Sequence, residues 1–196
     1  MAACVGSDEQ PREEAAGAAS LPPDLESAAP RVALQTSLGR IVLELDRDKA
    51  PQTVENFLYH VENHFYDGLT FHRVMPGFMI QAGGFTPEMM QRQSPRPPIR
   101  NEANNGLKNF RGALAMARLP SPHTATSQFF INLVDNAQLD FTAETPQGWG
   151  YAVFGRVIEG MEVVDAIAAV PTGSRAGHND VPLDPITIER AEILSK

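Results

Sequence analysis

Hydrophobic and polar residues alternate along much of the chain beyond residue 30, which is the pattern of β-strands that bury one face. Two alternating segments, 32–36 and 40–45, flank Ser37-Leu38-Gly39, so we predict a hairpin whose turn is supplied by glycine. The second segment places three aliphatic side chains on one face, which we expect to lie in the core: Ile41, Leu43 and Leu45.

Further apolar segments of strand length follow, and polar loops separate them. They span residues 71–75, 78–82, 112–117, 127–133, 151–157 and 186–193. The connection 87–108 is dense in Pro, Asn, Gln and Arg, and a loop of that length in a compact domain is usually functional.

Only two segments have a helical period. Residues 50–63 begin with Pro51 at a favourable first helical position and carry an apolar stripe of Val54, Phe57, Leu58 and Val61. A second, shorter helix is predicted over 161–169 and ends before Pro171. Many strands with two helices argue against βαβ units and favour an antiparallel barrel or sandwich whose open ends the helices cover.

The composition divides the chain into a tail and one domain. Residues 1–30 are rich in Ala, Glu, Pro and Ser without a hydrophobic period, so we predict a disordered acidic tail with net charge −5. Residues 31–196 are expected to form a single domain, because 42% of the 196 residues are apolar. The net charge of −8 disfavours nucleic-acid binding, and no apolar run is long enough to span a membrane.

Cys4 is the only cysteine, so the chain forms no intrachain disulfide. Ala2-Ala3-Cys4 resembles the end of a bacterial lipoprotein signal, but residues 1–20 lack the basic and apolar parts of such a signal. We therefore expect a cytoplasmic protein. A periplasmic location or a lipid anchor at Cys4 is the alternative, should an upstream signal be missing.

The stretch 71–85 carries the strongest candidate for a binding site. Pro76-Gly77 predicts a turn between two short strands, and the second strand places Met79 and Gln81 on one face. Arg73 arrives on the preceding strand, and no acidic residue within 71–85 offers it an ion partner. An apolar floor with one cation and one amide is typical of a binding site. The face shared by Gln128 and Phe130 offers a second amide with an aromatic ring.

Two other motifs favour structural roles. His60 and His64 have the spacing of zinc ligands on a helix, but no third ligand is evident, so we expect two solvent-facing histidines. Ser127 and His72 could belong to a hydrolase triad, but Ser127 lacks the Gly-x-Ser-x-Gly elbow, so a buried, hydrogen-bonded His72 is preferred. Gly83-Gly84 indicates a bend or a close backbone approach rather than a phosphate loop.

These segments resemble the signature blocks of the cyclophilins, which are peptidyl-prolyl cis-trans isomerases. The resemblance covers about residues 31–193, and the loops 101–108 and 147–151 are most similar to the short bacterial, cytoplasmic type. The blocks are Phe71-His72-Arg73, Pro76 to Gln81, Gly84-Phe85, Ser127 to Ile131 and Val153-Phe154-Gly155.

The resemblance implies a fold, an activity and a set of partners. The fold is a mainly β, closed eight-stranded antiparallel barrel capped by two α-helices. The activity is isomerisation of X-Pro bonds in proline-containing peptides and in unfolded or folding proteins, by a monomer without metal or cofactor. Two alternatives remain: a proline-binding module with little catalysis, and a docking domain that works through the tail or the 87–108 loop. Arg73 favours the enzyme, because holding a proline ring would not require a cation.

The resemblance also assigns site residues. Arg73 matches the catalytic arginine, while the substrate-binding positions match Phe78, Met79, Gln81, Ala117, Arg118, Gln128, Phe130, Leu139 and Tyr151. Arg118 stands where the family often has Asn, and its contact is expected to be mainly through the backbone. Tyr151 replaces a pocket histidine, and Gln138 replaces a rim tryptophan, so we expect weak binding of cyclosporin.

Overall fold

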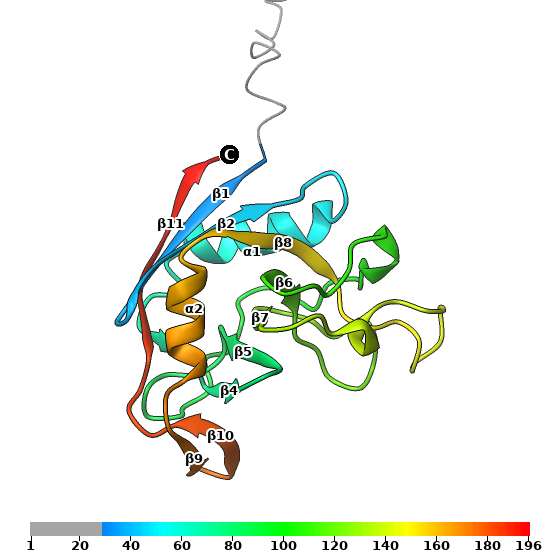
Figure 1. Cartoon of the computed structure of the whole chain (residues 1–196). Coiled ribbons are helices and arrows are strands. Elements are labelled where there is room, and N and C mark those ends of the chain that lie inside the picture. The colour runs from blue at the N-terminus through cyan, green and yellow to red at the C-terminus, as the bar shows by residue number, and fades with distance from the viewer. Residues whose placement is uncertain (1–28) are drawn as a thin grey trace, which may run out of the picture.

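The computed structural model describes residues 29–196 (Figure 1). The predicted tail therefore lies outside the described residues, apart from its last two. Pro30 already belongs to the domain, because it is buried and its carbonyl oxygen accepts a hydrogen bond of 2.8 Å from the backbone nitrogen of Leu45. The domain thus includes Pro30, which the sequence pattern had assigned to the tail.

The domain is mainly β, and nine strands form one antiparallel sheet. Their order across the sheet is β3-β11-β1-β2-β8-β6-β7-β5-β4. The strands are β1 Arg31–Thr36, β2 Gly39–Leu45, β3 Leu69–Thr70, β4 Arg73–Met75, β5 Met79–Ala82, β6 Ala113–Met116, β7 Phe129–Asn132, β8 Val153–Glu159 and β11 Thr187–Ser195.

The sheet curls so strongly that its two edges come together. β3 and β4 occupy opposite ends of the strand order, yet only Phe71 and His72 separate them in sequence. Phe71 donates its backbone N–H to the carbonyl of Ile186, at the start of the β11 region. The result is a mainly β, strongly curled antiparallel sheet, as expected, while the closure into a complete barrel stays a prediction. It differs from the expected eight strands by one because β3, with two residues, is too short to produce a recognisable pattern.

Both predicted helices are present, as α1 Pro51–Glu62 and α2 Met161–Ala168. α1 contacts β11, while α2 contacts β2, β4 and β5. The apolar stripe of α1 is buried as predicted, with Val54, Phe57, Leu58 and Val61 all at most 6% exposed. Two short 3₁₀ turns, η1 Ala103–Asn105 and η2 Ala137–Leu139, lie in the loops.

The two-residue period of β5 and β7 separates two apolar clusters, as the alternation predicts. Phe129 and Ile80 belong to the main core, where the Phe129 ring meets the Phe57 ring edge-on at 5.4 Å. Phe130 and Met79, one position along each strand, belong to a second cluster on the opposite face. This second face carries the candidate site.

Besides β3 and the two 3₁₀ turns, one pair of strands was not predicted. β9 Thr172–Arg175 and β10 His178–Pro182 form a separate two-stranded hairpin, and β10 packs beside β4. In Figure 1 the hairpin (orange) lies next to the β4–β5 hairpin (green). Its sequence is short, polar and glycine-containing, so it has no apolar alternation to mark it as a strand pair.

The turns of the site region follow their glycines. Gly77 has φ +73° and the backbone N–H of Phe78 returns to the Met75 carbonyl, which confirms the predicted break at Pro76-Gly77. Gly83 has φ +88°, and an added Cβ would lie 2.7 Å from the carbonyl oxygen of Ser127. The close backbone approach expected at Gly83-Gly84 is therefore confirmed.

Two histidine predictions are wrong in part. His64 is exposed as expected, but His60 is fully buried, with Nδ1 2.7 Å from the Asn56 carbonyl and Nε2 2.9 Å from the Ser94 hydroxyl. The loop 87–108 covers this end of α1, which the helical period alone does not reveal. His72 is buried as expected, but its Nδ1 has no hydrogen-bond partner among the described residues.

Candidate active site

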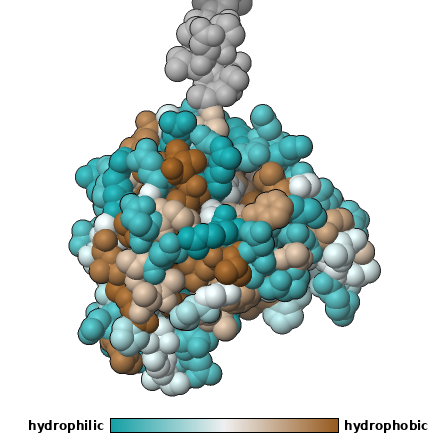
Figure 2. Space-filling view, in the orientation of Figure 1, coloured by the Kyte–Doolittle hydropathy of each residue, from teal (hydrophilic) through white to brown (hydrophobic). Residues whose placement is uncertain are grey.

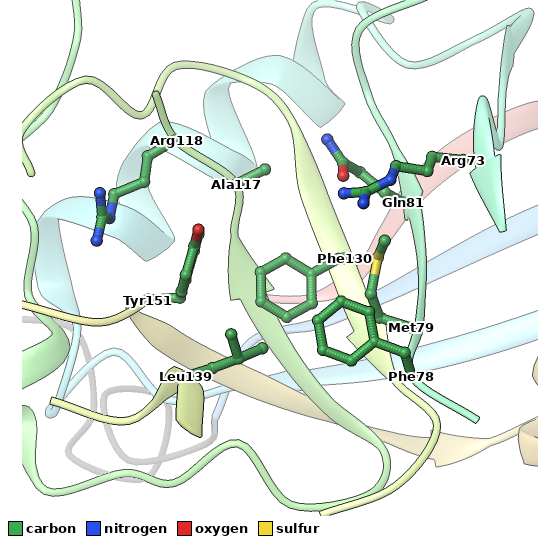
Figure 3. Close-up of a pocket in the computed structure, with 9 residues that line it drawn as sticks. All are labelled: Arg73, Phe78, Met79, Gln81, Ala117, Arg118, Phe130, Leu139 and Tyr151. Atoms are coloured by element: carbon green, nitrogen blue, oxygen red, sulfur yellow. The ribbon is translucent and has the colours of Figure 1, made fainter. Parts of the chain in front are cut away.

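An open pocket of about 180 Å³ lies on the second face of the sheet (Figure 3). Its lining contains nine of the ten residues that the sequence assigned to the site. These are Arg73, Phe78, Met79, Gln81, Ala117, Arg118, Phe130, Leu139 and Tyr151. The tenth, Gln128, lies directly behind the lining, where its Oε1 accepts a 2.9 Å hydrogen bond from Gln81 Nε2.

The strand register explains why these residues meet. Arg73 on β4 stands opposite Gln81 on β5, Gln81 stands opposite Phe130 on β7, and Phe130 stands opposite Ala115 on β6. Directly opposed residues in an antiparallel pair share a face and have Cβ atoms about 4.5–5.5 Å apart. A cation, an amide and an aromatic ring therefore lie in one row across three adjacent strands.

The apolar side of the pocket is assembled from strands and loops. Phe130 meets the Tyr151 ring edge-on at 5.6 Å. Leu139, at the end of η2, accepts a backbone hydrogen bond of 2.9 Å from Tyr151, which fixes these two walls relative to each other. Met79 lies between Arg73 and the Phe78 ring (Figure 3). Aromatic rings and compact apolar side chains thus form the surface against which a small apolar ring can pack.

Arg118 uses its side chain as well as its backbone. Its guanidinium lies 4.7 Å from the centre of the Tyr151 ring, and its Nε donates a 2.8 Å hydrogen bond to the Gly150 carbonyl. Its Nη1 donates to the carbonyls of Leu119 and Pro120 at 3.0 and 3.1 Å. These contacts lie within the protein, so the expected backbone contact of this position with a peptide stays a prediction.

Arg73 has an ion partner that the local sequence does not contain. Its Nε lies 3.9 Å from the Oδ2 of Asp180 on β10, and the two side chains are 44% and 39% exposed. Figure 3 shows the Arg73 guanidinium directed toward Gln81 and the pocket. Asp180 is the residue that the sequence reasoning missed, since it follows Arg73 by more than a hundred positions and lies in the unpredicted hairpin.

Two polar side chains near the pocket, Ser127 and His72, have structural surroundings and no catalytic partner among the described residues. Ser127, which is 2% exposed, donates its hydroxyl to the Gly83 carbonyl at 2.9 Å and accepts the Tyr66 hydroxyl at its own carbonyl. Ser127 is thus a structural hydrogen-bond link and not a nucleophile. Burial, followed by the nearby charge of His178, lowers the pKa of His72 from 6.5 to about 4, so His72 is neutral at pH 7.

Metal-binding clusters and membrane-spanning helices are both absent from the described residues. Within residues 29–196, no three His, Cys, Asp or Glu side chains lie close enough together to hold a metal ion. No helix in this part of the chain is long and apolar enough to cross a membrane. What the pocket offers is an apolar cleft, two arginines and the amide of Gln81, which is hydrogen-bonded to that of Gln128.

A curled antiparallel sheet with two helices, which holds a small apolar pocket edged by Arg73 and Arg118, defines a cyclophilin-like protein. The comparison with protein families agrees. Residues 31–193 match the family described as cyclophilin type peptidyl-prolyl cis-trans isomerase/CLD, so the chain belongs to this family.

Relatives and solved structures support the assignment. The chain is 61% identical over 163 residues to peptidyl-prolyl cis-trans isomerase cyp18 of Streptomyces antibioticus, covering 83% of this chain and 98% of that protein. It is 54% identical to peptidyl-prolyl cis-trans isomerase B of Escherichia coli, with the same coverage. A crystal structure of a cyclophilin-type isomerase from Cryptosporidium parvum superimposes with a TM-score of 0.69 at 29% identity, covering 86% of this chain and 99% of that one.

Proposed function

We propose that this protein is a peptidyl-prolyl cis-trans isomerase in which Arg73 is the catalytic residue. The observation that carries the proposal is the row formed by Arg73, Gln81 and Phe130 on adjacent strands. This row sets a cation in the lining of an apolar cleft of about 180 Å³, which can take a proline ring.

The reaction requires little covalent chemistry. Amide resonance gives peptide rotation a barrier of about 18–20 kcal/mol, so X-Pro bonds exchange over tens to hundreds of seconds without a catalyst. Twisting the bond breaks the conjugation and returns a lone pair to the prolyl nitrogen. A donor that meets this nitrogen only in the twisted state lowers the barrier, because catalysis depends on interactions that are stronger in the transition state.

The pocket residues supply these interactions. The arginine fork of Arg73 donates to the twisted prolyl nitrogen, and it stays charged at every physiological pH. The apolar walls hold the proline ring, while the amides of Gln81 and Gln128 fix the peptide backbone on either side. No proton is transferred and no bond to the protein forms, so these residues complete the mechanism by binding, orientation and one hydrogen bond.

An exchange measurement on a short X-Pro peptide tests the function. We expect catalytic amounts of the protein to broaden or cross-saturate the cis and trans NMR signals, and Arg73→Ala to remove most of this effect while the melting temperature stays near that of the parent. Arg73→Lys is also expected to fail, because one flexible point charge does not replace the fork.

Arg40→Ala is the matched control for the arginine. Arg40 is 45% exposed and forms a comparably long ion pair of 3.6 Å with Glu159, but it lies on β2, outside the pocket. Its loss should leave the isomerase rate unchanged. Near-full activity of the Arg73→Ala variant would contradict the catalytic role of Arg73.

The second candidate is a proline-binding module with little catalysis. It uses the same apolar pocket, and a related C. parvum isomerase, 28% identical with a TM-score of 0.68, was crystallised in the presence of the dipeptide Ala-Pro. The exchange assay separates the two functions, since a module would bind the peptide without raising its interconversion rate. Arg73 at the pocket edge favours the enzyme.

Substrates, compartment and assembly follow as parts of the proposal. The open pocket suits proline-containing peptides and folding protein chains, on which the protein would act as a monomer. Truncation to Ala29–Lys196 should preserve melting temperature and activity, because residues 1–28 have few large apolar side chains and no hydrophobic period, and Pro30 is retained. Mass spectrometry of the native protein decides between a cytoplasmic chain and one lipidated at Cys4.

A further inference from the structure

The edge of the site is bordered by the β9–β10 hairpin. β4, which carries Arg73, is the last strand of the sheet and pairs through its backbone with β5 alone. On its other side β10 packs against it, without joining the nine-stranded sheet. The catalytic arginine therefore stands between its own sheet and an element that contributes nothing to the pocket lining.

Asp180 occupies an unusual backbone conformation within this hairpin. Its φ is +60°, in the left-handed region that few residues other than Gly, Asn and Asp tolerate. The β9–β10 pairing shifts register between His178 and Val181, around the same residue. A local departure from regular pairing of this kind re-aims a side chain, and here it coincides with a carboxylate 3.9 Å from Arg73.

The hairpin is held in place on both sides of Asp180. Val181 is 4% exposed and packs in a small apolar cluster with Phe85 and Met89. The His178 ring meets the Phe85 ring at 4.9 Å. Phe85 in turn accepts a backbone hydrogen bond from Thr70 on β3, so the cluster is tied to the sheet. Asp180 is presented by a fixed support rather than by a free loop.

The ion pair with Asp180 leaves the two Nη groups of Arg73 free to bind a substrate. Asp180 approaches Nε, and no described residue forms a hydrogen bond with the Arg73 guanidinium. At 3.9 Å the carboxylate attracts the charge without consuming an N–H group. Both Nη groups therefore remain directed toward the pocket, where Figure 3 shows them beside Gln81.

We propose that Asp180 is a positioning residue for Arg73, and that the β9–β10 hairpin is part of the isomerase machinery. The inference rests on the proposed function, since it assigns a partner to the arginine that acts on the prolyl nitrogen. A long, half-exposed arginine side chain samples many rotamers. The carboxylate favours those rotamers that direct the guanidinium of Arg73 toward the substrate.

Asp180→Asn is the sharpest test, because asparagine tolerates a positive φ as well as aspartate does and removes only the charge. We expect the on-enzyme exchange rate to fall about two- to fivefold, which is the scale of an exposed ion pair, while the affinity for the peptide stays the same. Asp180→Glu should restore part of the rate. The NMR order parameter of the Arg73 Nε–H group should fall in the Asn variant and recover in the Glu variant.

Asp184→Asn provides the matched control. Asp184 is exposed, lies just beyond the hairpin and forms no ion pair with any described residue. The same chemical change at this site should alter neither the rate nor the Arg73 order parameter. An unchanged or increased rate in Asp180→Asn would overturn the proposal. It would mean that the carboxylate does not position Arg73, or that it only offsets the positive charge that the reaction uses.

A double-mutant cycle separates this inference from the proposed function. In an Arg73→Ala background, Asp180→Asn should have no further effect on the residual rate. If Arg73→Ala is fully active, the proposed mechanism fails. If Arg73→Ala is inactive and Asp180→Asn matches the parent protein, only the positioning role fails.

Discussion

Gln81 Nε2 donates a 2.9 Å hydrogen bond to Gln128 Oε1 and so links β5 to the residue directly before β7. Both side chains belong to the face that carries the pocket, and the link fixes the orientation of the two amides. The Gln81 oxygen stays available to accept from a bound peptide. Pre-orientation of this kind matters because a misplacement of about 1 Å in a positioning group can cost about a hundredfold in rate.

Gly84 sets the space in which Gln128 lies, so Gly84→Ala should lower activity without unfolding the protein. An added Cβ would lie 2.5 Å from Cδ and Nε2 of Gln128, at the end of a flexible side chain that can move aside. The backbone of Gly84 is not left-handed, so alanine fits its conformation. We expect kcat/KM to fall about tenfold while the melting temperature changes by a few degrees at most.

Gly83→Ala is the contrasting variant for this test. Gly83 has φ +88°, and its added Cβ would meet the backbone oxygen of Ser127 at 2.7 Å. It should therefore lose stability, by about 1–3 kcal/mol in chemical denaturation. Equal losses of stability in the two variants would contradict the specific link between Gly84 and Gln128.

Arg118→Asn should raise KM and lower stability, although the family resemblance implies that the change is tolerated. The substitution removes the 2.8 Å hydrogen bond to Gly150 and the stacking on Tyr151. Because Arg118 is half-buried, we expect a loss of about 1 kcal/mol in urea unfolding and a several-fold increase in KM for a short prolyl peptide.

Arg118→Lys tests which property of the side chain matters. Lysine keeps the charge over the ring but cannot reach three carbonyls with a planar fork. An intermediate KM is expected. If both variants match the parent protein, the side chain of Arg118 has no part in holding Tyr151.

Part of the pocket could be predicted from the two-residue period of its strands, whereas Ala117, Arg118, Leu139 and Tyr151 were assigned only through the family resemblance. Met79, Gln81 and Phe130 project to one face by the two-residue period, and this face is set by the burial of Ile80 and Phe129 on the other. The partner of Arg73 could not be found in this way. Asp180 lies in a polar hairpin whose position depends on packing around Phe85 and not on any period.

The errors at histidine have a similar cause. His60 was expected in solvent because it lies near the end of α1, but Ser94 in the following long loop covers it and bonds its Nε2 at 2.9 Å. The helical period shows which residues share a face of a helix. It does not show whether a loop elsewhere in the chain buries that face. A long loop rich in Pro and Asn was the only signal that something covers this end.

The stability should fall as the pH is lowered from about 6.5 to 4, because of His72. Burial lowers its pKa to about 4, so over this range the unfolded chain binds a proton that the native state does not. Stability is therefore complete above pH 6.5 and decreases as the pH falls toward the native pKa. The full decrease is on the order of 3 kcal/mol. Urea unfolding at a series of pH values measures it.

His72→Gln should flatten this pH dependence, whereas His64→Gln, which changes an exposed histidine, should leave it unaltered. Burial also lowers the pKa of His60, so part of the slope is expected to persist in the His72 variant. The isomerase rate of the folded protein should stay constant over the same range, because the proposed mechanism transfers no proton. An unchanged slope in His72→Gln would contradict the assignment.

Cyclosporin should bind weakly, and Gln138→Trp should tighten it. Gln138 stands in η2 beside the pocket wall formed by Leu139, is exposed and donates its Nε2 to the Asn136 side chain at 3.1 Å. A large apolar ligand that covers this rim must desolvate the amide and gains little contact area in return. A tryptophan there should recover about 1–3 kcal/mol, or tenfold to a hundredfold in affinity. Short prolyl peptides depend on the pocket itself, so their turnover should change little.

Gln93→Trp, at an exposed glutamine outside the pocket lining, is the control and should leave cyclosporin affinity unaltered. Calorimetric titration of the three proteins gives the answer: low-nanomolar binding by the parent protein, or equal affinities in all three, would show that Gln138 does not set this preference.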